Sequence, residues 1–285
     1  MQKSINGATF RKMVLAGVSL LEQNKEYIDS LNVFPVPDGD TGTNMFLTMK
    51  SAVGEINKCM NNDLASLSEA FSKGALRGAR GNSGVITSQI FKGFCSVTKN
   101  CKEITTKDFA KAMQEGATIA YKAVTKPKEG TILTVIRVMA ENAVALAKKH
   151  DDFDVFFRKV IDTGEEILKQ TPEMLPVLKK AGVVDSGGRG ILVIFTGFQR
   201  YLAGEEDLEY TFEDETKPQT VDDVIADINQ LGDIEFGYCT EYMIINMLKK
   251  TTEADIDKLR EKLMEIGDSV ICIGDLSLVK VHVHT

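Results

Sequence analysis

The sequence predicts a mainly α-helical protein with a smaller α/β segment at its C-terminal end. Between Asn6 and about Leu202, apolar residues recur at steps of three and four, which places them on one face of successive helices. An acidic, proline-containing stretch follows, and beyond it short runs of strand-forming residues surround one helical pattern. We therefore expect a helical domain at residues 1–205, a linker at 206–219, and the beginning of an α/β domain at 220–285.

The first part is expected to contain about seven or eight helices joined by short loops. The earliest are indicated by apolar spacing in the runs Phe10–Leu21 and Leu64–Phe71. Thr105 begins a capping sequence, which predicts a helix from there to about Val124. Three further helices are predicted at 131–148, 154–169 and 190–202. Breaks are predicted at Thr171-Pro172, at Met174-Leu175-Pro176 and at Gly182.

The second part is predicted to hold three strands and one helix. The strands are expected at 238–247, 268–273 and 278–284, and the helix at 253–266. A single threonine follows the last strand, so we expect the chain to stop inside its second domain. A small sheet whose final strand is unpaired is only marginally stable. We therefore expect residues 220–285 to unfold before the helical domain.

Composition disfavours several functional classes. The net charge of −7 argues against non-specific binding to nucleic acid or insertion into membranes, because both kinds of contact favour basic surfaces. Apolar runs are too short to span a bilayer, and the N-terminal residues lack the apolar core of a signal peptide. The five cysteines are scattered without a CxxC motif, which favours reduced thiols. A cytoplasmic globular protein is therefore expected.

The turn between Asn32 and Asp40, which we call the aspartate turn, is the strongest indication of chemistry. Asp38 and Asp40 lie two residues apart, and Gly39 allows a tight turn in which both carboxylates point the same way. Paired carboxylates are typical ligands of Mg²⁺, which is commonly shared with substrate phosphates. A helix is predicted to start at Thr41, and unpaired N–H groups at a helix start favour anions. The alternative is an ordinary loop that caps a surface helix.

Three further glycine-rich turns precede predicted helices, at Gly78–Gly84, 128–131 and 184–190. We call the first of them the glycine turn. Glycine lets backbone N–H groups approach a phosphate, and Asn82 and Ser83 could cap the helix that follows. Each turn alone is more simply a helix–helix connection, but together they fit a site at one end of a bundle. Candidates for neutralising phosphate are Arg77, Arg80 and Arg189, although most surface arginines are solvated or paired.

Cys239, His282 and His284, which we call the Cys/His cluster, form a second candidate group. The two histidines alternate on a predicted strand and therefore share one face, which suits capture of a metal ion. Cys239 lies on another predicted strand, and a Cys/His₂ set of ligands suits zinc. The alternative is a buried thiol and two histidines that face solvent at a strand end. Spacing alone favours this alternative because an HxH pair is short and common.

The chain resembles the nucleotide-binding domain of the dihydroxyacetone-kinase L-subunit superfamily over four stretches, Asn32–Met45, Gly78–Gly84, Lys126–Thr134 and Gly182–Gly190. The closer resemblance is to its bacterial branch, the large subunit of fatty-acid kinase. The specific signals are the phrase NVFPVPDGDTGTNM and the ending KVHVHT, and the resemblance covers essentially the whole chain. It implies an antiparallel barrel or bundle of about eight helices that binds ATP and two Mg²⁺ ions at one end, followed by part of a middle domain.

The resemblance also implies roles for individual residues. Asp38 and Asp40 match two of three metal-binding aspartates, and Asn32 stands near the third position, either as an amide or water-mediated ligand or as a gap in the set. The phosphates are expected beside Thr41, Gly42, Thr43, Asn44, Asn82 and Ser83. The remaining nucleotide contacts are expected from Gly130, Thr131, Asp185, Ser186 and Gly187. His282 and His284 match metal or active-site positions of the middle domain, with Cys239 as a third zinc ligand.

The implied reaction is transfer of a phosphoryl group from ATP to the carboxylate of a fatty acid, which gives an acyl phosphate. Metal ions and positioning carry most of such a reaction, and a carboxylate already ionised near pH 7 needs no general base. The sequence offers no histidine near the aspartate turn, which agrees with this expectation. In the resembled system, a separate fatty-acid-binding carrier protein presents the acyl chain.

Two other functions stay open from the sequence. One is a non-catalytic nucleotide-binding module with a regulatory role, and the other is a dihydroxyacetone-type kinase for small hydroxyl compounds. The residues around Asp38 and the added α/β segment favour the fatty-acid branch. A homodimer is one oligomeric state that the sequence permits, and neither the acyl chain nor the carrier is specified.

Overall fold

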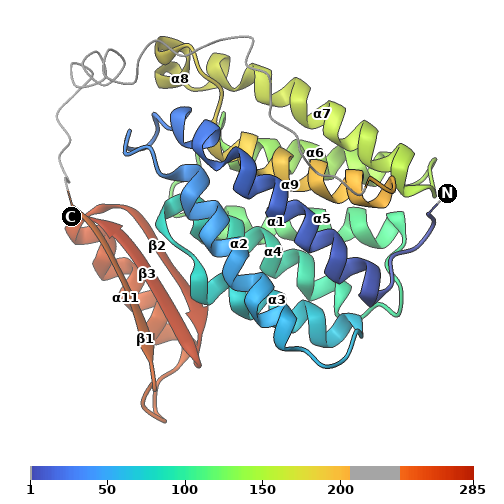
Figure 1. The fold of residues 1–285 in the computed structure, drawn as a ribbon. Helices are drawn as coiled ribbons and strands as arrows, with labels where there is room; N and C mark the ends of the chain where they lie inside the picture. Colours follow the sequence, from blue (N-terminus) through green and yellow to red (C-terminus); the bar gives the residue numbers. More distant parts are fainter. Residues whose placement is uncertain (1, 206–237) are drawn as a thin grey trace.

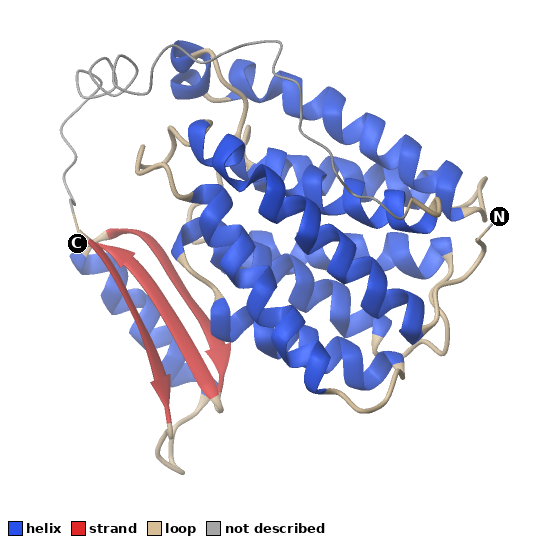
Figure 2. Cartoon of the chain, in the orientation of Figure 1, coloured by secondary structure: helices blue, strands red, loops and turns tan. Residues whose placement is uncertain are grey.

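The computed structural model describes residues 2–205 and 238–285, which form a helical domain with a small sheet at its side (Figures 1 and 2). The helices of the domain are α1 (Gly7–Ser30), α2 (Thr41–Lys58), α3 (Leu64–Gly78), α4 (Gly81–Thr98), α5 (Thr106–Ala123), α6 (Ile132–Leu146), α7 (Phe153–Met174), α8 (Pro176–Ala181) and α9 (Ser186–Leu202). Among the described helices, none combines the length and the hydropathy that a bilayer span requires. The predicted fold class, mainly α with a partial α/β segment, is confirmed.

A cluster of phenylalanine rings forms the centre of the helical domain. Phe109 of α5 lies edge-on to Phe94 of α4 and to Phe157 of α7, with ring centroids 4.8 and 4.9 Å apart. Phe195 of α9 meets the same ring edge-on at 6.2 Å. Such pairs contribute about 0.5–1.5 kcal/mol each beyond the burial of their area. Because the rings come from helices far apart in sequence, their packing fixes the positions of the loops that those helices carry.

The starts of four helices meet at one end of this domain. The Ser186 hydroxyl, at the start of α9, donates to Thr41 Oγ1 at the start of α2 over 3.2 Å. Ser83, in the first turn of α4, donates to the carbonyl oxygen of Thr41 at 3.4 Å. The Asp185 carboxylate accepts from the backbone of Ile132 at the start of α6. The glycine-rich turns that precede these helices are therefore brought to one end, as the sequence predicts.

One predicted break is wrong. The sequence predicts a break at Thr171-Pro172, but α7 continues through Pro172 to Met174. A proline within a helix lacks the N–H that would bond to the carbonyl four residues earlier. Here that carbonyl belongs to Leu168, and the Thr171 hydroxyl donates to it at 2.7 Å. This substitute hydrogen bond lets the helix run on, and Pro176 then begins α8 as a separate element.

The C-terminal elements are β1 (Cys239–Ile245), α11 (Glu253–Ile266), β2 (Asp268–Asp275) and β3 (Leu278–His284). The strands pair antiparallel in the order β1-β3-β2, so the last strand of the chain lies at the centre of the sheet. The expectation of an unpaired final strand is therefore wrong, and the reason for expecting early unfolding of 220–285 falls with it. The predicted linker lies outside the described residues, and the domain boundaries stay a prediction.

Alternation along β3 gives the sheet two different faces. The valines of this strand pack with α11 in an apolar cluster. Lys280, His282 and His284 lie on the opposite face, and the Lys280 ammonium donates to the carbonyl of Ala79 at the end of α3. Ile271 of β2 packs in one apolar cluster with Ala79. This face of the sheet therefore covers the turn between α3 and α4, beside the end where the helix starts meet (Figure 1).

Candidate active site

The aspartate turn links the end of α1 to the start of α2. Gly39 has φ of 65°, a left-handed conformation, which reverses the chain between the two aspartates. Asn32 is 7% exposed, and its amide donates to the carbonyl of Val36 at 2.6 Å while accepting from the Thr41 hydroxyl. The Asn32 side chain thus braces the turn from within. Its role as a magnesium ligand stays a prediction.

The two carboxylates of the aspartate turn are close enough to share a hydrogen bond. Partial burial raises the pKa of Asp38 to about 6, and the charge of Asp40 and a hydrogen bond with its side chain act in the same direction. Two adjacent carboxylates repel each other when both are ionised, and a divalent cation relieves that repulsion. Asp40 is the N-cap residue of α2, yet within the described structure its side chain makes no capping hydrogen bond. Its carboxylate is therefore available to a metal ion.

Sequence reasoning missed Asp29, whose carboxylate partly neutralises the positive charge at the first turn of α2. Asp29 of α1 accepts from the Thr43 backbone N–H at 3.0 Å and from its hydroxyl at 2.7 Å. Thr41 and Asn44 are buried, and Gly42 is buried where α2 packs on α1. A phosphate at this helix start would share its donors with the Asp29 carboxylate. Because Asp29 lies fourteen residues before Thr43, no local sequence signal pointed to this contact.

The glycine turn leads from α3 into α4 and packs on α2. Gly81 has φ of 56°, and a Cβ atom there would collide with the Asn44 side chain, so only glycine fits. Asn82 and Ser83 follow at half-buried positions in the first turn of α4. The structure therefore brings Asn44, Asn82 and Ser83 to one place, and the shape of the turn serves helix packing as well as any ligand.

The turn before α6 is held by an ionic network. Thr134 accepts from the N–H of Gly130 at 2.9 Å and donates to Glu129 at 2.7 Å. The same carboxylate accepts from Arg137 at 2.8 Å. The Thr131 hydroxyl donates to a carbonyl within the turn. Gly130 and Thr131 thus lie at the start of α6 with partners of their own, and Glu129, which sequence reasoning passed over, organises the turn.

The three candidate arginines have different surroundings. Arg189 of α9 forms an ion pair with Glu165 of α7, with 2.6 Å between their nitrogen and oxygen atoms. Arg77 and Arg80 lie on either side of the glycine turn. Arg189 is therefore a structural residue in this state, while Arg77 and Arg80 keep their predicted role as phosphate neighbours.

Asp185 is a buried carboxylate at the start of α9. It accepts from the N–H of Gly188 at 2.7 Å, and this cap starts the helix at Ser186 rather than at the predicted Gly190. Burial raises the pKa of Asp185 to about 6, although hydrogen bonds from the backbone act against the rise. Ser186 and Gly187 are buried beside it in the first turn. Asp185, Ser186 and Gly187 therefore belong to the buried wall of the candidate active site.

We expect Asp185→Asn to stabilise the folded protein above neutral pH. Because the folded-state pKa lies above its ordinary value, the aspartate contributes stability at low pH that is lost as the pH rises through about 6. A rise from 3.8 to about 6 corresponds to roughly 3 kcal/mol as an upper bound. Asparagine keeps the cap without the charge. Urea unfolding at about pH 5 and about pH 8 tests this, and an unchanged pH dependence in the variant would contradict it.

The Cys/His cluster forms where β1 and β3 pair. The ligand atoms of Cys239, His282 and His284 lie within 4.8 Å of one another, and Cys239 Sγ is 3.6 Å from His282 Nδ1. His282 and His284 are 1% and 7% exposed, while Cys239 is exposed. The alternative of solvent-facing histidines and a buried thiol is therefore wrong. The reason is that this face of the sheet packs on the helical domain.

The surroundings of the two histidines fit a metal ion. His282 Nδ1 lies 2.9 Å from Glu241 Oε1, and the buried His282 Nε2 has no hydrogen-bond partner among the described residues. A buried polar atom without a partner is costly, which favours a site that a ligand completes. Burial and the neighbouring His282 lower the pKa of His284, which favours the neutral imidazole that metals bind.

The aspartate turn and the Cys/His cluster are neighbours in the structure, although most of the chain separates them in sequence. Burial raises the pKa of Cys239, and the charges of Glu241, Asp38 and Asp40 raise it further. His282 in turn opposes the raised pKa of Asp38. The sequence has no histidine near the aspartate turn, but the structure brings His282 to it, because the sheet folds back onto this end of the helical domain.

Sequence reasoning also missed Glu241 and Lys280, which share the sheet face of the Cys/His cluster. Glu241 follows Cys239 by two residues, and Lys280 precedes His282 by two. Residues two apart on a strand point to the same side of the sheet. This spacing could have predicted that Glu241 and Lys280 lie on the face of the Cys/His cluster.

Two family descriptions match different parts of the chain. The sequence matches the family described as DAK2 domain over residues 35–200, which contain most of the aspartate turn, the glycine turn and Asp185. The chain belongs to this family. Residues 235–285, which contain the Cys/His cluster, match the FakA-like family of fatty acid kinase middle domains. The two matches together support a kinase-related function.

Several relatives cover nearly the whole chain. Protein YloV of Bacillus subtilis (strain 168) is 45% identical over 291 residues, which are 99% of this chain and 51% of YloV. An uncharacterized protein of Staphylococcus aureus (strain bovine RF122 / ET3-1), SAB1090, is 44% identical over 100% of this chain and 52% of its own length. The chain spans about half the length of these curated relatives.

A solved structure shows the same fold at low identity. The crystal structure of the dihydroxyacetone kinase of C. freundii matches with a TM-score of 0.50 and 18% identity. The match covers 70% of this chain and 35% of that chain. At this identity the likeness establishes the fold alone.

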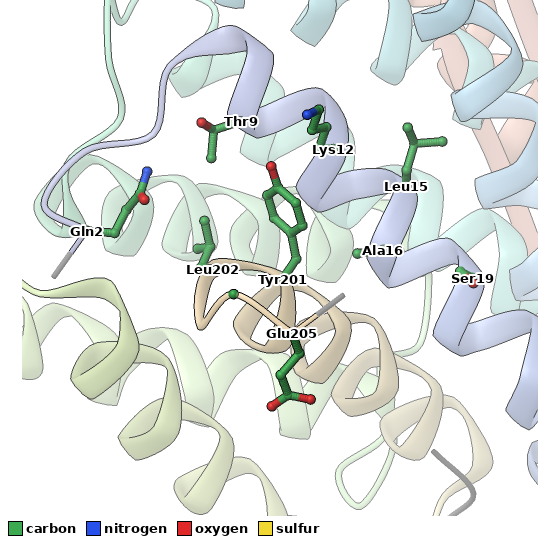
Figure 3. A pocket seen from close by; sticks show the side chains of 10 residues that line it. Gln2, Thr9, Lys12, Leu15, Ala16, Ser19, Tyr201, Leu202 and Glu205 are labelled. Atoms are coloured by element: carbon green, nitrogen blue, oxygen red, sulfur yellow. The ribbon is translucent and has the colours of Figure 1, made fainter. Parts of the chain in front are cut away.

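A separate pocket of about 650 Å³ lies at the opposite end of α1 and α9 (Figure 3). Its walls combine apolar side chains, such as Leu15 and Leu202, with polar ones such as Lys12 and Glu205. Its lining includes none of the predicted site residues. Because the lengths of α1 and α9 separate the two ends, a substitution in this pocket is a suitable control for substitutions in the aspartate turn.

Proposed function

We propose that this chain is the ATP-dependent kinase part of a fatty-acid kinase. It transfers a phosphoryl group from ATP to the carboxylate of a fatty acid that a carrier protein presents. The observation that carries the proposal is the meeting of the aspartate turn with the Cys/His cluster on a DAK2-family domain. The match of residues 235–285 to a fatty acid kinase middle domain supports a fatty acid as the acceptor.

The aspartate turn fits magnesium. Asp38 and Asp40 offer hard oxygen ligands in one turn, and a cation bound there would relieve the repulsion between the two carboxylates. On the family resemblance we propose two ions. Asp38 and Asp40 would hold the magnesium, which would help to neutralise the charge that spreads over the transferred group. We assign the phosphates to Thr41–Asn44 with Asn82 and Ser83.

Positioning by the protein accounts for the rest of the chemistry. Asn32 braces the aspartate turn, and Ser83 ties the start of α4 to the start of α2, where we propose that N–H groups and hydroxyls would bind the phosphates. The fatty carboxylate is ionised near neutral pH, so its oxygen attacks the γ-phosphorus directly. The bond from that phosphorus to the bridging oxygen breaks, ADP leaves with the electron pair, and no proton moves. An acyl phosphate and ADP are the products.

The Cys/His cluster fits zinc. Cys239, His282 and His284 supply the sulfur and nitrogen ligands that zinc prefers, and the unpartnered His282 Nε2 indicates a site that a ligand completes. Cys239, His282 and His284 would hold the zinc ion, which would link β1 to β3 and supply a Lewis acid. We therefore propose His282 and His284 as active-site residues beside the aspartate turn.

A non-catalytic nucleotide-binding role is the second candidate. It is favoured by the hydrogen bond from Thr43 to Asp29, because a carboxylate already occupies one donor that a phosphate would use. A dihydroxyacetone-type activity is less well supported, since the solved dihydroxyacetone kinase shares only the fold and the middle-domain match points to a different acceptor.

Acyl phosphate formation separates these functions. With ATP, Mg²⁺ and a fatty-acid-loaded carrier, we expect product that hydroxylamine traps as a hydroxamate, and none with dihydroxyacetone in place of the fatty acid. The longer relative YloV is assayed in parallel. Asp40→Asn should remove the product in a chain that stays folded. ATP binding without product from either protein would favour the non-catalytic role.

A further inference from the structure

A single carboxylate connects the two halves of the proposed site. Glu241 lies on β1, on the face that covers the helical domain. Its Oε1 accepts from the backbone N–H of Gly81 at 2.7 Å and lies 2.9 Å from His282 Nδ1. Gly81 belongs to the glycine turn and His282 to the Cys/His cluster. One oxygen atom therefore contacts both.

Lys280 strengthens this connection from the central strand. Its side chain is buried, its ammonium donates to the carbonyl of Ala79, and it lies 3.8 Å from Glu241 Oε2. A charge removed from water is costly unless it is paired and hydrogen-bonded. Here Glu241 and Lys280 satisfy each other and two backbone groups of the glycine turn. The pair therefore fixes this turn against the sheet from two adjacent points.

We infer that Glu241 is a positioning residue, which holds the start of α4 and the His282 imidazole in one fixed relation. The inference rests on the proposed function, because that function assigns the start of α4 to the phosphates and the Cys/His cluster to zinc. Toward the metal, Glu241 is the outer carboxylate that orients a ligating histidine. Toward the nucleotide, it keeps the N–H groups of the first turn of α4 in place.

Two substitutions separate these roles. Glu241→Ala removes both contacts, whereas Glu241→Gln keeps an oxygen that can accept from Gly81 and loses the charge beside His282. We expect amide hydrogen exchange of residues 78–84, followed by mass spectrometry, to become about ten-fold faster in the alanine variant and to stay near wild type in the glutamine variant. Zinc affinity, measured by competition with a chelator, should fall by about 10-fold to 100-fold in both. Thr240→Ala, on the other face of β1, is the matched control and should change neither quantity.

Neither measurement uses ATP turnover, so the outcome is independent of the acyl phosphate assay. Failure of that assay together with the expected Glu241 results would reject the kinase and keep the positioning role. Unchanged exchange and unchanged zinc affinity in Glu241→Ala would overturn the inference. Faster exchange along the whole chain would overturn it as well, since a general loss of stability would then explain the effect. A wild-type chain that binds no zinc would remove the half of the inference that concerns His282.

Discussion

Asp38→Ala and Asp40→Ala should each weaken magnesium-dependent ATP binding on the order of 100-fold, or about 3 kcal/mol. The two carboxylates lie in one turn, so each variant removes half of the hard oxygen ligands that the pair offers. The remaining carboxylate cannot hold the cation and the phosphates in the same geometry. Isothermal titration calorimetry with ATP and Mg²⁺ measures the loss directly.

The same variants should stay folded, and without ligand their melting temperature should hold or rise. Gly39 and the Asn32 side chain shape the turn, and neither is changed. Above about pH 6 the ionised Asp38 carries an unfavourable interaction in the folded state, because its folded-state pKa is raised. Alanine removes that interaction. Lys12→Ala in the distant pocket is the control, and unchanged ATP affinity in both aspartate variants would reject the magnesium assignment.

The helices could be predicted from sequence because local signals and tertiary packing agree. Thr105 and Asp108 form the capping box that the sequence indicates, with Thr105 as the N-cap and Asp108 in the first turn of α5. The apolar period of three and four follows from burial of one face against the phenylalanine core. Prediction fails at Pro172, where a threonine hydroxyl replaces the missing backbone donor. Such a rescue depends on one side-chain rotamer, which residue patterns do not specify.

The candidate site could be predicted only in pieces. The aspartate turn and the Cys/His cluster are each visible as local motifs, but their contact depends on how the sheet docks on the turn between α3 and α4. That docking is made by Lys280, Ile271 and Glu241, which reach residues far away in the sequence. No local pattern contains that information. The burial of both histidines follows from the same docking, which is why spacing alone favours the wrong alternative.

The position of β3 explains how the two motifs come to act on each other. As the central strand, β3 is fixed by pairing on both edges, and its alternate residues must face either α11 or the helical domain. The valines occupy the apolar side, so the polar residues are directed at the glycine turn and the aspartate turn. The charge interactions between His282 and Asp38, and between Cys239 and both aspartates, are therefore consequences of strand order. A metal ion in one motif would alter the electrostatic environment of the other.

Protein purified without chelator should contain close to one zinc ion per chain, and His284→Ala should lose it. The ligand atoms of the Cys/His cluster lie within 4.8 Å of one another, close enough for small side-chain movements to bring each to about 2.0–2.3 Å from a common centre. Removing His284 leaves two ligands, which is too few to retain zinc through purification. Elemental analysis by mass spectrometry measures the metal content of both proteins.

Stability provides a second, independent measure of the same site. Zinc that binds only the folded sheet stabilises it by mass action, by about 2.7 kcal/mol at a free concentration 100 times the dissociation constant. Addition of a chelator should therefore lower the melting temperature of the wild type and leave His284→Ala unaffected. His150→Ala is the matched control, because this histidine lies between α6 and α7, outside the cluster. Equal zinc content in the two histidine variants, or a wild type that binds no zinc and ignores the chelator, would show that these residues hold no metal and that their burial serves the packing of the sheet alone.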